Sequence, residues 1–322
     1  MAEKNKNKKI ISALAKTAFI AGSAYLLVGE AIYEGALNSR FINARKNKFR
    51  QIEPELAKFY GDADNMLTGD SWFVAKNPEI TPLITEDMGT VYANIIPSDK
   101  DTDLWAIVVH GYTSCPRGMA EQAKGFHDMG YNVLLPFLRG HGVDENKYCS
   151  MGYYDKDYIV KWIDYILTLN ENAKIVLLGV SMGSATVMLT TGEALPENVR
   201  CAIADCGYTS CWDEYKAQIV EMFHLPAFPF LYAANTVSKL RGNFDFKKCA
   251  PIAAVARSNT PTLFIHGEKD TFVPYEMLDR VYDACSAEKE KLSVPDAIHA
   301  ESVDIHPDMY WAKIKSFIAK HI

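Results

Sequence analysis

The sequence predicts an α/β fold: a mostly parallel sheet with helices on both faces and a helical lid insertion. Beyond residue 85, apolar strand-like runs alternate with helical patterns, as in βα units of a parallel sheet. One of these runs enters a helix through the turn Gly-Val-Ser-Met-Gly at 179–183. Residues 207–258 interrupt the alternation, because they exceed the length of a single crossover helix. These three observations together predict the architecture.

The strands follow in order along the chain. An antiparallel strand is expected first, over 91–96. The main strands are then predicted at 104–109, 131–135, 174–178, 199–205, 262–265 and 290–294. Apolar residues recur at helical spacing from Tyr158 to Ile166, which indicates a helix packed on the core. A closing helix is predicted over 307–320.

The turn at 179–183 is the most informative stretch. It follows the apolar run 174–178 and precedes a helical pattern, and a serine there with glycine two residues on either side is the sequence form of a nucleophile elbow. Such a turn is too tight for side chains at the glycines, and it holds the serine in a strained conformation that exposes its hydroxyl. Ser181 is therefore the predicted nucleophile. The alternative is an ordinary turn with an N-capping serine.

A serine nucleophile needs a base and an acid that orients the base. Asp270 lies in the loop after the strand at 262–265, and His299 lies in the loop after the last strand. Because loops at the carboxyl ends of parallel strands share one edge of the sheet, these side chains can converge on Ser181. Two alternatives remain: Asp205 also ends a strand, and His306 is a second histidine, although it directly precedes the closing helix.

The oxyanion of such a reaction is bound by backbone N–H groups. The residue after the nucleophile, Met182, is one expected donor. The strand at 104–109 ends in His110-Gly111-Tyr112, where the glycine allows the chain to turn the N–H of Tyr112 toward the elbow. Tyr112 and Met182 are therefore the predicted oxyanion hole.

These motifs together resemble the α/β-hydrolase superfamily. They are His110-Gly111-Tyr112, Arg139-Gly140-His141-Gly142, 179–183, His266 to Asp270 with Val273-Pro274, and His299. The chain is most similar to bacterial serine hydrolases (esterases, lipases and peptidases) with a membrane-proximal N-terminal segment, over roughly residues 85–321. One departure is Phe137, where many relatives carry aspartate before the Arg-Gly-His-Gly turn. That turn is usually structural, so the departure bears little on catalysis.

The resemblance implies a metal-independent serine hydrolase that cleaves carboxylic esters through an acyl-serine intermediate. The expected substrate is a small-molecule ester or acyl compound, with no cofactor and no metal. A serine aminopeptidase or amidase on the same machinery is the first alternative. The second is a catalytically silent, membrane-tethered binding module that retains the fold. An intact triad argues against the silent module. The sequence leaves the oligomeric state open.

Residues 207–258 are expected to form the lid, since the superfamily commonly places a lid after the strand that is predicted here at 199–205. The segment is rich in aromatic residues, and Pro226 and Pro229 break it into short helices. An apolar acyl pocket under the lid is predicted to be lined by Trp212, Phe223, Phe228 and Phe230. The alternative is an ordinary helical excursion packed on the core.

The N-terminus predicts a membrane anchor. Four lysines precede the apolar run 10–29, and a helix of that length spans about 30 Å, enough for one bilayer crossing. A signal peptide centred on 17–29 and an amphipathic surface helix are alternatives. The basic N-terminus favours a catalytic domain outside the cell, whereas cysteines that look reduced favour the cytosolic side. We expect the catalytic domain to lie on the outer side of the membrane. The predicted division is an anchor over 1–40, a linker and extension over 41–84, and a hydrolase domain over 85–322.

Composition agrees with such an enzyme and excludes other classes. A formal net charge of −6 without a basic patch gives no reason to expect nucleic-acid binding. Phosphate-loop and dinucleotide-binding glycine motifs do not occur. The seven cysteines are scattered and lack zinc-finger spacing, so reduced thiols are the simpler interpretation.

Overall fold

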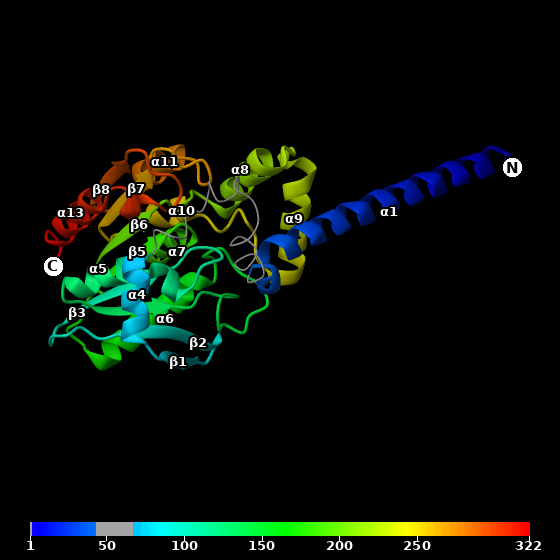
Figure 1. Ribbon diagram of the computed structural model, residues 1–322. Coiled ribbons are helices and arrows are strands. Elements are labelled where there is room, and N and C mark those ends of the chain that lie inside the picture. Colours follow the sequence, from blue (N-terminus) through cyan, green and yellow to red (C-terminus); the bar gives the residue numbers. More distant parts are fainter. Residues whose placement is uncertain (1, 43–66) are drawn as a thin grey trace.

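The computed structural model describes residues 2–42 and 67–322 (Figure 1). Its strands are β1 Ile80–Thr85, β2 Gly89–Ile96, β3 Leu104–Val109, β4 Asn132–Pro136, β5 Lys174–Val180, β6 Val199–Asp205, β7 Thr262–Gly267 and β8 Lys289–Val294. Its helices are α1 Ala2–Leu37, α4 Leu67–Lys76, η2 Pro116–Met119, α5 Ala120–Asp128, α6 Asp155–Leu169, α7 Met182–Thr191, α8 Cys211–Phe223, α9 Ala227–Gly242, α10 Pro251–Val255, α11 Glu276–Ala284, α12 Ser302–Ile305 and α13 Pro307–Ile318.

The strands form one eight-stranded sheet in the order β1-β2-β4-β3-β5-β6-β7-β8. β2 pairs antiparallel with β1 and β4, and the remaining neighbours are parallel. This confirms the predicted α/β fold and its early antiparallel strand. The sequence missed β1, an edge strand whose residues alternate between exposed and half-buried and which contains Pro82.

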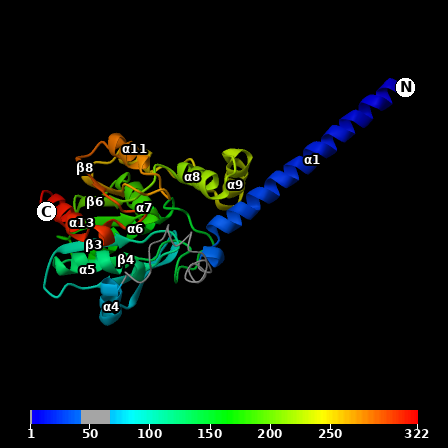
Figure 2. The same ribbon diagram turned by 45° about the horizontal axis from the view of Figure 1, so that its top comes forward.

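Both faces of the sheet are covered by helices (Figure 2). Along β5, Ile175 and Leu177 belong to one buried cluster and Val176 and Leu178 to another, because successive strand residues point to opposite faces. Helices α6 and α7 contribute to the first cluster, and α5 and α13 to the second. The central strands therefore read as continuous apolar runs, and for this reason they could be found in the sequence.

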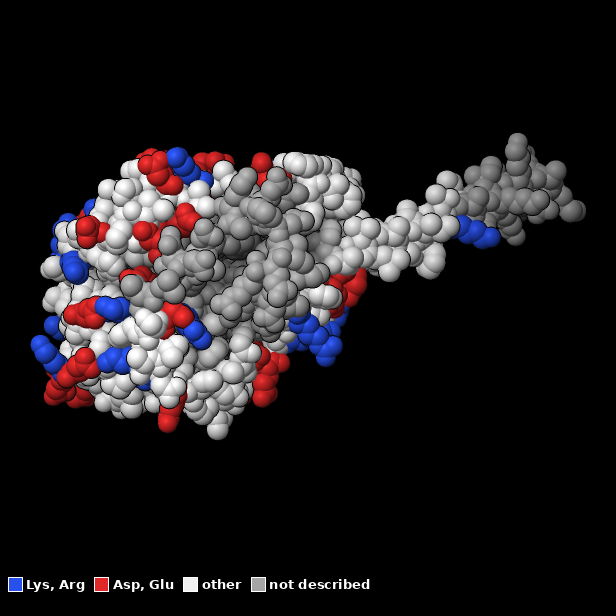
Figure 3. All heavy atoms as spheres, in the orientation of Figure 1, with Lys and Arg blue, Asp and Glu red and all other residues white. Residues whose placement is uncertain are grey.

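Helix α1 projects from the domain as a long rod (Figures 1 and 3). The helical stretch Leu14–Leu37 is long and apolar enough to cross a membrane, and only 6% of its most apolar 18 residues is buried. A signal sequence would have the same length and composition. The end of α1 is different, because Tyr33 and Leu37 are 2% and 0% exposed and belong to the main core cluster, together with Ile42. The last turns of α1 therefore form part of the folded domain.

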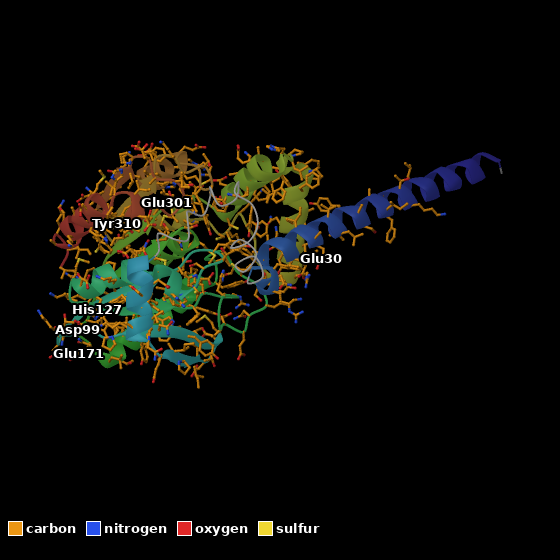
Figure 4. The ribbon with its side chains drawn as sticks, viewed as in Figure 1. Glu30, Asp99, His127, Glu171, Glu301 and Tyr310 are labelled. Atoms are coloured by element: carbon orange, nitrogen blue, oxygen red, sulfur yellow. The ribbon has the colours of Figure 1, made fainter. Side chains whose placement is uncertain are left out.

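The insertion helix α9 lies along the base of α1, near the position labelled Glu30 in Figure 4. The two backbones approach closely at Gly29, where an added Cβ would lie 2.4 Å from the carbonyl oxygen of Ala233. Arg241 pairs with Glu30 and with Glu34, the latter at 2.9 Å. The segment 207–258 thus contacts the N-terminal helix. The predicted domain divisions at residues 40 and 84 stay predictions, and most of the linker, 43–66, lies outside the described residues.

Candidate active site

Ser181 occupies the turn between β5 and α7 in a conformation with φ 57° and ψ −119°. The glycines around it are required by close approach. A Cβ on Gly179 would lie 2.2 Å from the carbonyl oxygen of Gly183, and one on Gly183 would lie 2.1 Å from that of Val109. A positive φ is strained for any residue other than glycine, and such strain clusters at functional sites. The local geometry is that of a nucleophile elbow.

His299 joins Ser181 to Asp270. Its Nε2 lies 2.8 Å from Ser181 Oγ, and its Nδ1 lies 2.8 Å from Asp270 Oδ2. The Phe272 ring packs against the imidazole at a centroid distance of 4.8 Å. All three members of this chain are buried, with 9% or less of each residue exposed. The structure thus brings the three predicted side chains together from loops after β5, β7 and β8.

Asp270 is held as an anion. Its Oδ1 accepts the N–H groups of Phe272 and Val273 at 3.0 and 2.9 Å, and its Oδ2 also lies 3.2 Å from Nε2 of His266. Burial alone would raise the pKa of this carboxyl, but the neighbouring His299 and His266 rings lower it to about 2. An ionised Asp270 accepts the Nδ1–H of His299, which leaves Nε2 free to accept a proton from Ser181.

Asp205, the alternative acid, has other partners. Its Oδ1 accepts the hydroxyl of Ser302 at 3.2 Å, and burial raises its pKa to about 6 although nearby histidines lower it. Its backbone carbonyl accepts the N–H of Ser181 at 2.9 Å, so Asp205 supports the elbow through the main chain. His306, the alternative base, lies at the start of α13. The geometry therefore favours Asp270 and His299.

The two predicted oxyanion donors belong to segments next to Ser181. Met182 is the first residue of α7, and the first N–H groups of a helix have no partner within it. Gly111 lies directly against Ser181, since a Cβ added there would be 3.4 Å from the serine Cβ. His110 steadies this loop: its Nδ1 lies 2.8 Å from Gly111 O, and its Nε2 lies 3.1 Å from the N–H of Leu138. The roles of Tyr112 and Met182 as oxyanion donors remain a proposal.

The side chain of Tyr112 reaches the N-terminal helix. Its hydroxyl donates to the carbonyl oxygen of Ala36, in the last turn of α1, at 2.6 Å. The loop next to Ser181 is therefore hydrogen-bonded to the segment that carries the candidate membrane span. The sequence offered no signal for this bond, because the two residues are far apart along the chain.

Helix α8 places polar side chains next to the triad, and these were also missed. Gln218 donates to the carbonyl of Phe272 at 2.6 Å and to Glu214 Oε1 at 2.9 Å. Glu214 is 3% exposed, and burial raises its pKa to about 8, to which Asp270 adds although the bond from Gln218 lowers it. Among the described residues, Oε2 of Glu214 is buried without a hydrogen-bond partner. The four-residue spacing of Glu214 and Gln218 was the available signal, because it puts both on one helix face.

The four predicted pocket residues divide into two pairs. Phe223 and Phe228 are 61% and 68% exposed, at the surface of the insertion. Trp212 and Phe230 are half-buried, and Trp212 packs edge-on against Tyr232 with the ring centroids 5.0 Å apart. Their role in lining an acyl pocket stays a prediction.

A buried thiol lies beside the triad. The ligand atoms of Cys206, Asp270 and His299 all lie within 4.8 Å of one another, an arrangement that could in principle hold a metal ion. Burial, followed by the nearby Asp205 and Asp270 charges, raises the pKa of the Cys206 thiol well above 9. Because metals bind the thiolate, the protonated thiol does not favour a metal site here. None of the seven cysteines forms a disulfide.

Comparisons with known proteins agree with this geometry. A family model described as the alpha/beta hydrolase fold matches residues 107–231. The uncharacterized protein YqkD of Bacillus subtilis is 30% identical over 220 residues, which cover 68% of this chain and 72% of that protein. The thermostable monoacylglycerol lipase of Bacillus sp. strain H-257 is 25% identical over 67% of this chain and 90% of its own length.

Solved structures show the same fold. The esterase Pf2001 of Pyrococcus furiosus superposes with a TM-score of 0.62 at 21% identity, over 77% of this chain and 95% of that one. The acylaminoacyl peptidase of Pyrococcus horikoshii gives 0.55 at 17% identity, over 75% of this chain and 40% of the peptidase. With the elbow, the sheet order and these similarities together, the chain belongs to the α/β-hydrolase fold family.

Proposed function

We propose that this protein is a serine hydrolase that cleaves carboxylic esters through an acyl-serine intermediate. The observation that carries the proposal is the buried chain of hydrogen bonds from Ser181 through His299 to Asp270, 2.8 Å at each step. Nucleophile, base and orienting acid in this geometry define the triad of acyl-transfer enzymes.

The reaction follows from these positions. Ser181 Oγ attacks the acyl carbonyl carbon while its proton passes to Nε2 of His299. Asp270 holds the Nδ1–H of the ring and stabilises the imidazolium. The N–H groups of Tyr112 and Met182 bind the oxyanion of the tetrahedral intermediate. When that intermediate collapses, the alcohol leaves with the proton from His299, and the acyl group stays on Ser181.

Deacylation uses the same groups. Water gives a proton to Nε2 of His299 and attacks the acyl-serine carbonyl, and a second tetrahedral intermediate forms at the same N–H donors. Its collapse returns the proton to Ser181 and releases the carboxylic acid. Every proton transfer passes through His299.

Similar proteins with stated activities favour esters as the substrate class. The similar proteins with stated activities include a monoacylglycerol lipase and an esterase. An aromatic-rich insertion also suits an apolar acyl group. If Phe230 and Trp212 line the pocket, kcat/KM should rise with acyl length by up to roughly fourfold per methylene until the pocket is full.

A serine aminopeptidase or amidase is the second candidate, and one observation favours it. The unpartnered Oε2 of Glu214 lies buried on α8 beside the triad, and the α-ammonium of a bound peptide would favour the ionised carboxylate and pair with it. In that case Glu214→Gln would lower turnover of aminoacyl anilides while sparing acetyl esters. Equal effects on both substrates would count against ammonium recognition.

We further propose that α1 is retained as a membrane anchor. Cleavage of a signal sequence after α1 would remove Tyr33 and Leu37, which pack in the core, and the carbonyl of Ala36, which accepts the hydroxyl of Tyr112. Carbonate-washed membranes should therefore retain the full-length chain, and a mature form lacking α1 would contradict the anchor. We place the catalytic domain on the outer side, and protease accessibility in intact cells tests this orientation.

The test of the function is covalent labelling. A fluorophosphonate probe should label the full chain in mild detergent, and Ser181→Ala should abolish labelling. Ser184→Ala is the matched control, because its hydroxyl is buried three residues further on with no partner among the described residues. Labelling that survives Ser181→Ala would reject the assignment. A panel of p-nitrophenyl esters and aminoacyl anilides then separates esterase from amidase activity.

A further inference from the structure

The insertion exposes an apolar tip where its two long helices meet. The tip comprises residues 220–232, the end of α8, the turn after it and the first turns of α9. Its exposed side chains are large and apolar or aromatic: Val220 41%, Phe223 61%, Leu225 38%, Phe228 68% and Tyr232 42%. Glu221 is the one acidic residue in this segment, which also contains His224 and has no lysine or arginine. Exposed apolar side chains gathered in one short segment mark an interaction site.

Helix α9 joins this tip to α1. Arg241, near the end of α9, meets Glu30 and Glu34 of α1. Further back on α9, Thr236 lies 3.2 Å from Tyr25 through their hydroxyls, and Ala233 meets Gly29. The contacts with Tyr25 and Gly29 therefore come from the part of α9 that is nearer the tip, and the contacts with the two glutamates come from its end.

The figures show the same arrangement. In both ribbon views α8 and α9 lie on the side of the domain from which α1 departs (Figures 1 and 2). The surface over these helices beside α1 is largely uncharged in Figure 3. From Thr17 to Gly29 the sequence of α1 has no charged residue, and its exposed side chains include Phe19, Ile20 and Leu27 at 76%, 67% and 70%. The apolar tip and the apolar segment of α1 thus lie on the same side of the domain.

We propose that the apolar tip, residues 220–232, inserts into the interfacial layer of the same membrane leaflet that α1 enters. The occupant is the lipid bilayer, because the tip lies on the side of the domain from which the anchor departs and exposes aromatic side chains suited to the boundary between headgroups and acyl chains. The Arg241–Glu30 pair then lies at the level of the headgroups, where the apolar run of α1 ends. This inference rests on the proposal that α1 is a retained anchor.

Insertion of the tip would bring the active site close to substrates that are dissolved in the bilayer. Helix α8, which runs from the tip, also carries Gln218, hydrogen-bonded to the loop of Asp270 and Phe272. A tip seated in the leaflet therefore holds the triad close to the membrane surface, so an ester that partitions into the bilayer reaches Ser181 without crossing bulk water.

Site-specific photocrosslinking in proteoliposomes tests the proposal. The full chain, reconstituted in phosphatidylcholine vesicles that contain a traceable phospholipid, would carry p-benzoylphenylalanine at position 228 or, separately, at 223. Because Phe228 is 68% exposed, the aromatic replacement should not disturb folding. Position 84 on β1 is the matched control, because Ile84 is 83% exposed on the edge strand of the domain. The same crosslinking residue at position 19 on α1 tests whether the anchor itself contacts lipid.

We expect lipid adducts at 228 and 223 at least about tenfold above those at 84, together with strong adducts at 19. Adducts at 19 with background levels at 223 and 228 would overturn the tip insertion while leaving the anchor intact. Background levels at all positions would reject both. Chain-to-chain adducts at 228 in place of lipid adducts would overturn the proposal in favour of a second copy as occupant. None of these readouts needs turnover, so failure of the serine-hydrolase mechanism is detected separately by loss of fluorophosphonate labelling.

Discussion

Leu37→Ala tests whether the end of α1 belongs to the catalytic domain. Leu37 is fully buried in the main core cluster with Tyr33 and Ile42. Replacing a buried leucine with alanine removes apolar contacts and leaves a cavity, at a cost of about 2–5 kcal/mol. Proteins of this kind are stable by about 5–15 kcal/mol, so the loss is a large fraction of the total.

The same helix supplies the control. Leu27 is 70% exposed, so Leu27→Ala should change the free energy of unfolding by less than about 0.5 kcal/mol. Melting temperatures of large domains change by about 2–4 °C per kcal/mol. Leu37→Ala should therefore melt roughly 4–20 °C below the wild type, and Leu27→Ala close to it.

The assay is thermal unfolding of the full chain in mild detergent. Near-ultraviolet circular dichroism and the residual ester turnover are both measured at each temperature. Loss of tertiary signal and of turnover should occur together, because the end of α1 is bonded to the loop of Tyr112. Equal melting temperatures for Leu37→Ala and Leu27→Ala would refute the reasoning and make the whole of α1 an appendage.

Three further predictions follow from the site and the base of α1. Asp270→Asn should lower kcat by about 10³- to 10⁴-fold, and Asp205→Asn far less, in steady-state ester assays at pH 7; the reverse ranking would make Asp205 the acid. Burial raises the pKa of Glu214 from 4.5 to about 8, so the stability of the wild type falls as the pH rises between these two values. The melting temperature of Glu214→Gln, measured relative to the wild type, should therefore rise from pH 5 to pH 8 and then level off. A difference in melting temperature that stays constant with pH would contradict the raised pKa. A chain starting at residue 28 should be folded and active, whereas one starting at 43 should lack turnover and tertiary circular dichroism, and equal activity of the two would exclude a structural role for 28–42.

The parts of the site that sequence reasoning found are those with local causes. The elbow is recognisable because Gly179 and Gly183 each face a backbone carbonyl at a distance that no side chain permits. Asp270 was found because it follows β7, a buried strand with an apolar run, and His299 because it lies in the loop after the last predicted strand. The choice between Asp270 and Asp205 needed the structure, because it depends on which carboxylate reaches the imidazole across the sheet edge.

The parts that were missed depend on tertiary contacts. β1 lies at the sheet edge, half-exposed and with a proline, so it lacks the apolar run that marks its neighbours. Gly29 looks like any glycine in an apolar segment until the backbone of α9 is placed against it. Glu214 reads as a surface residue near a helix start, and only the packing of α8 over the triad buries it.

The close contact between Gly29 and Ala233 has a consequence for synthesis. The two residues are separated by roughly 200 positions, which a ribosome takes about 10–40 s to add at 5–20 residues per second. During that interval the buried face of α1 has no α9 to pack against, although the helix itself has already left the ribosome. Tyr33 and Leu37 therefore lack this packing partner throughout the interval, and a chaperone that covers this face during elongation would protect the nascent chain from aggregation.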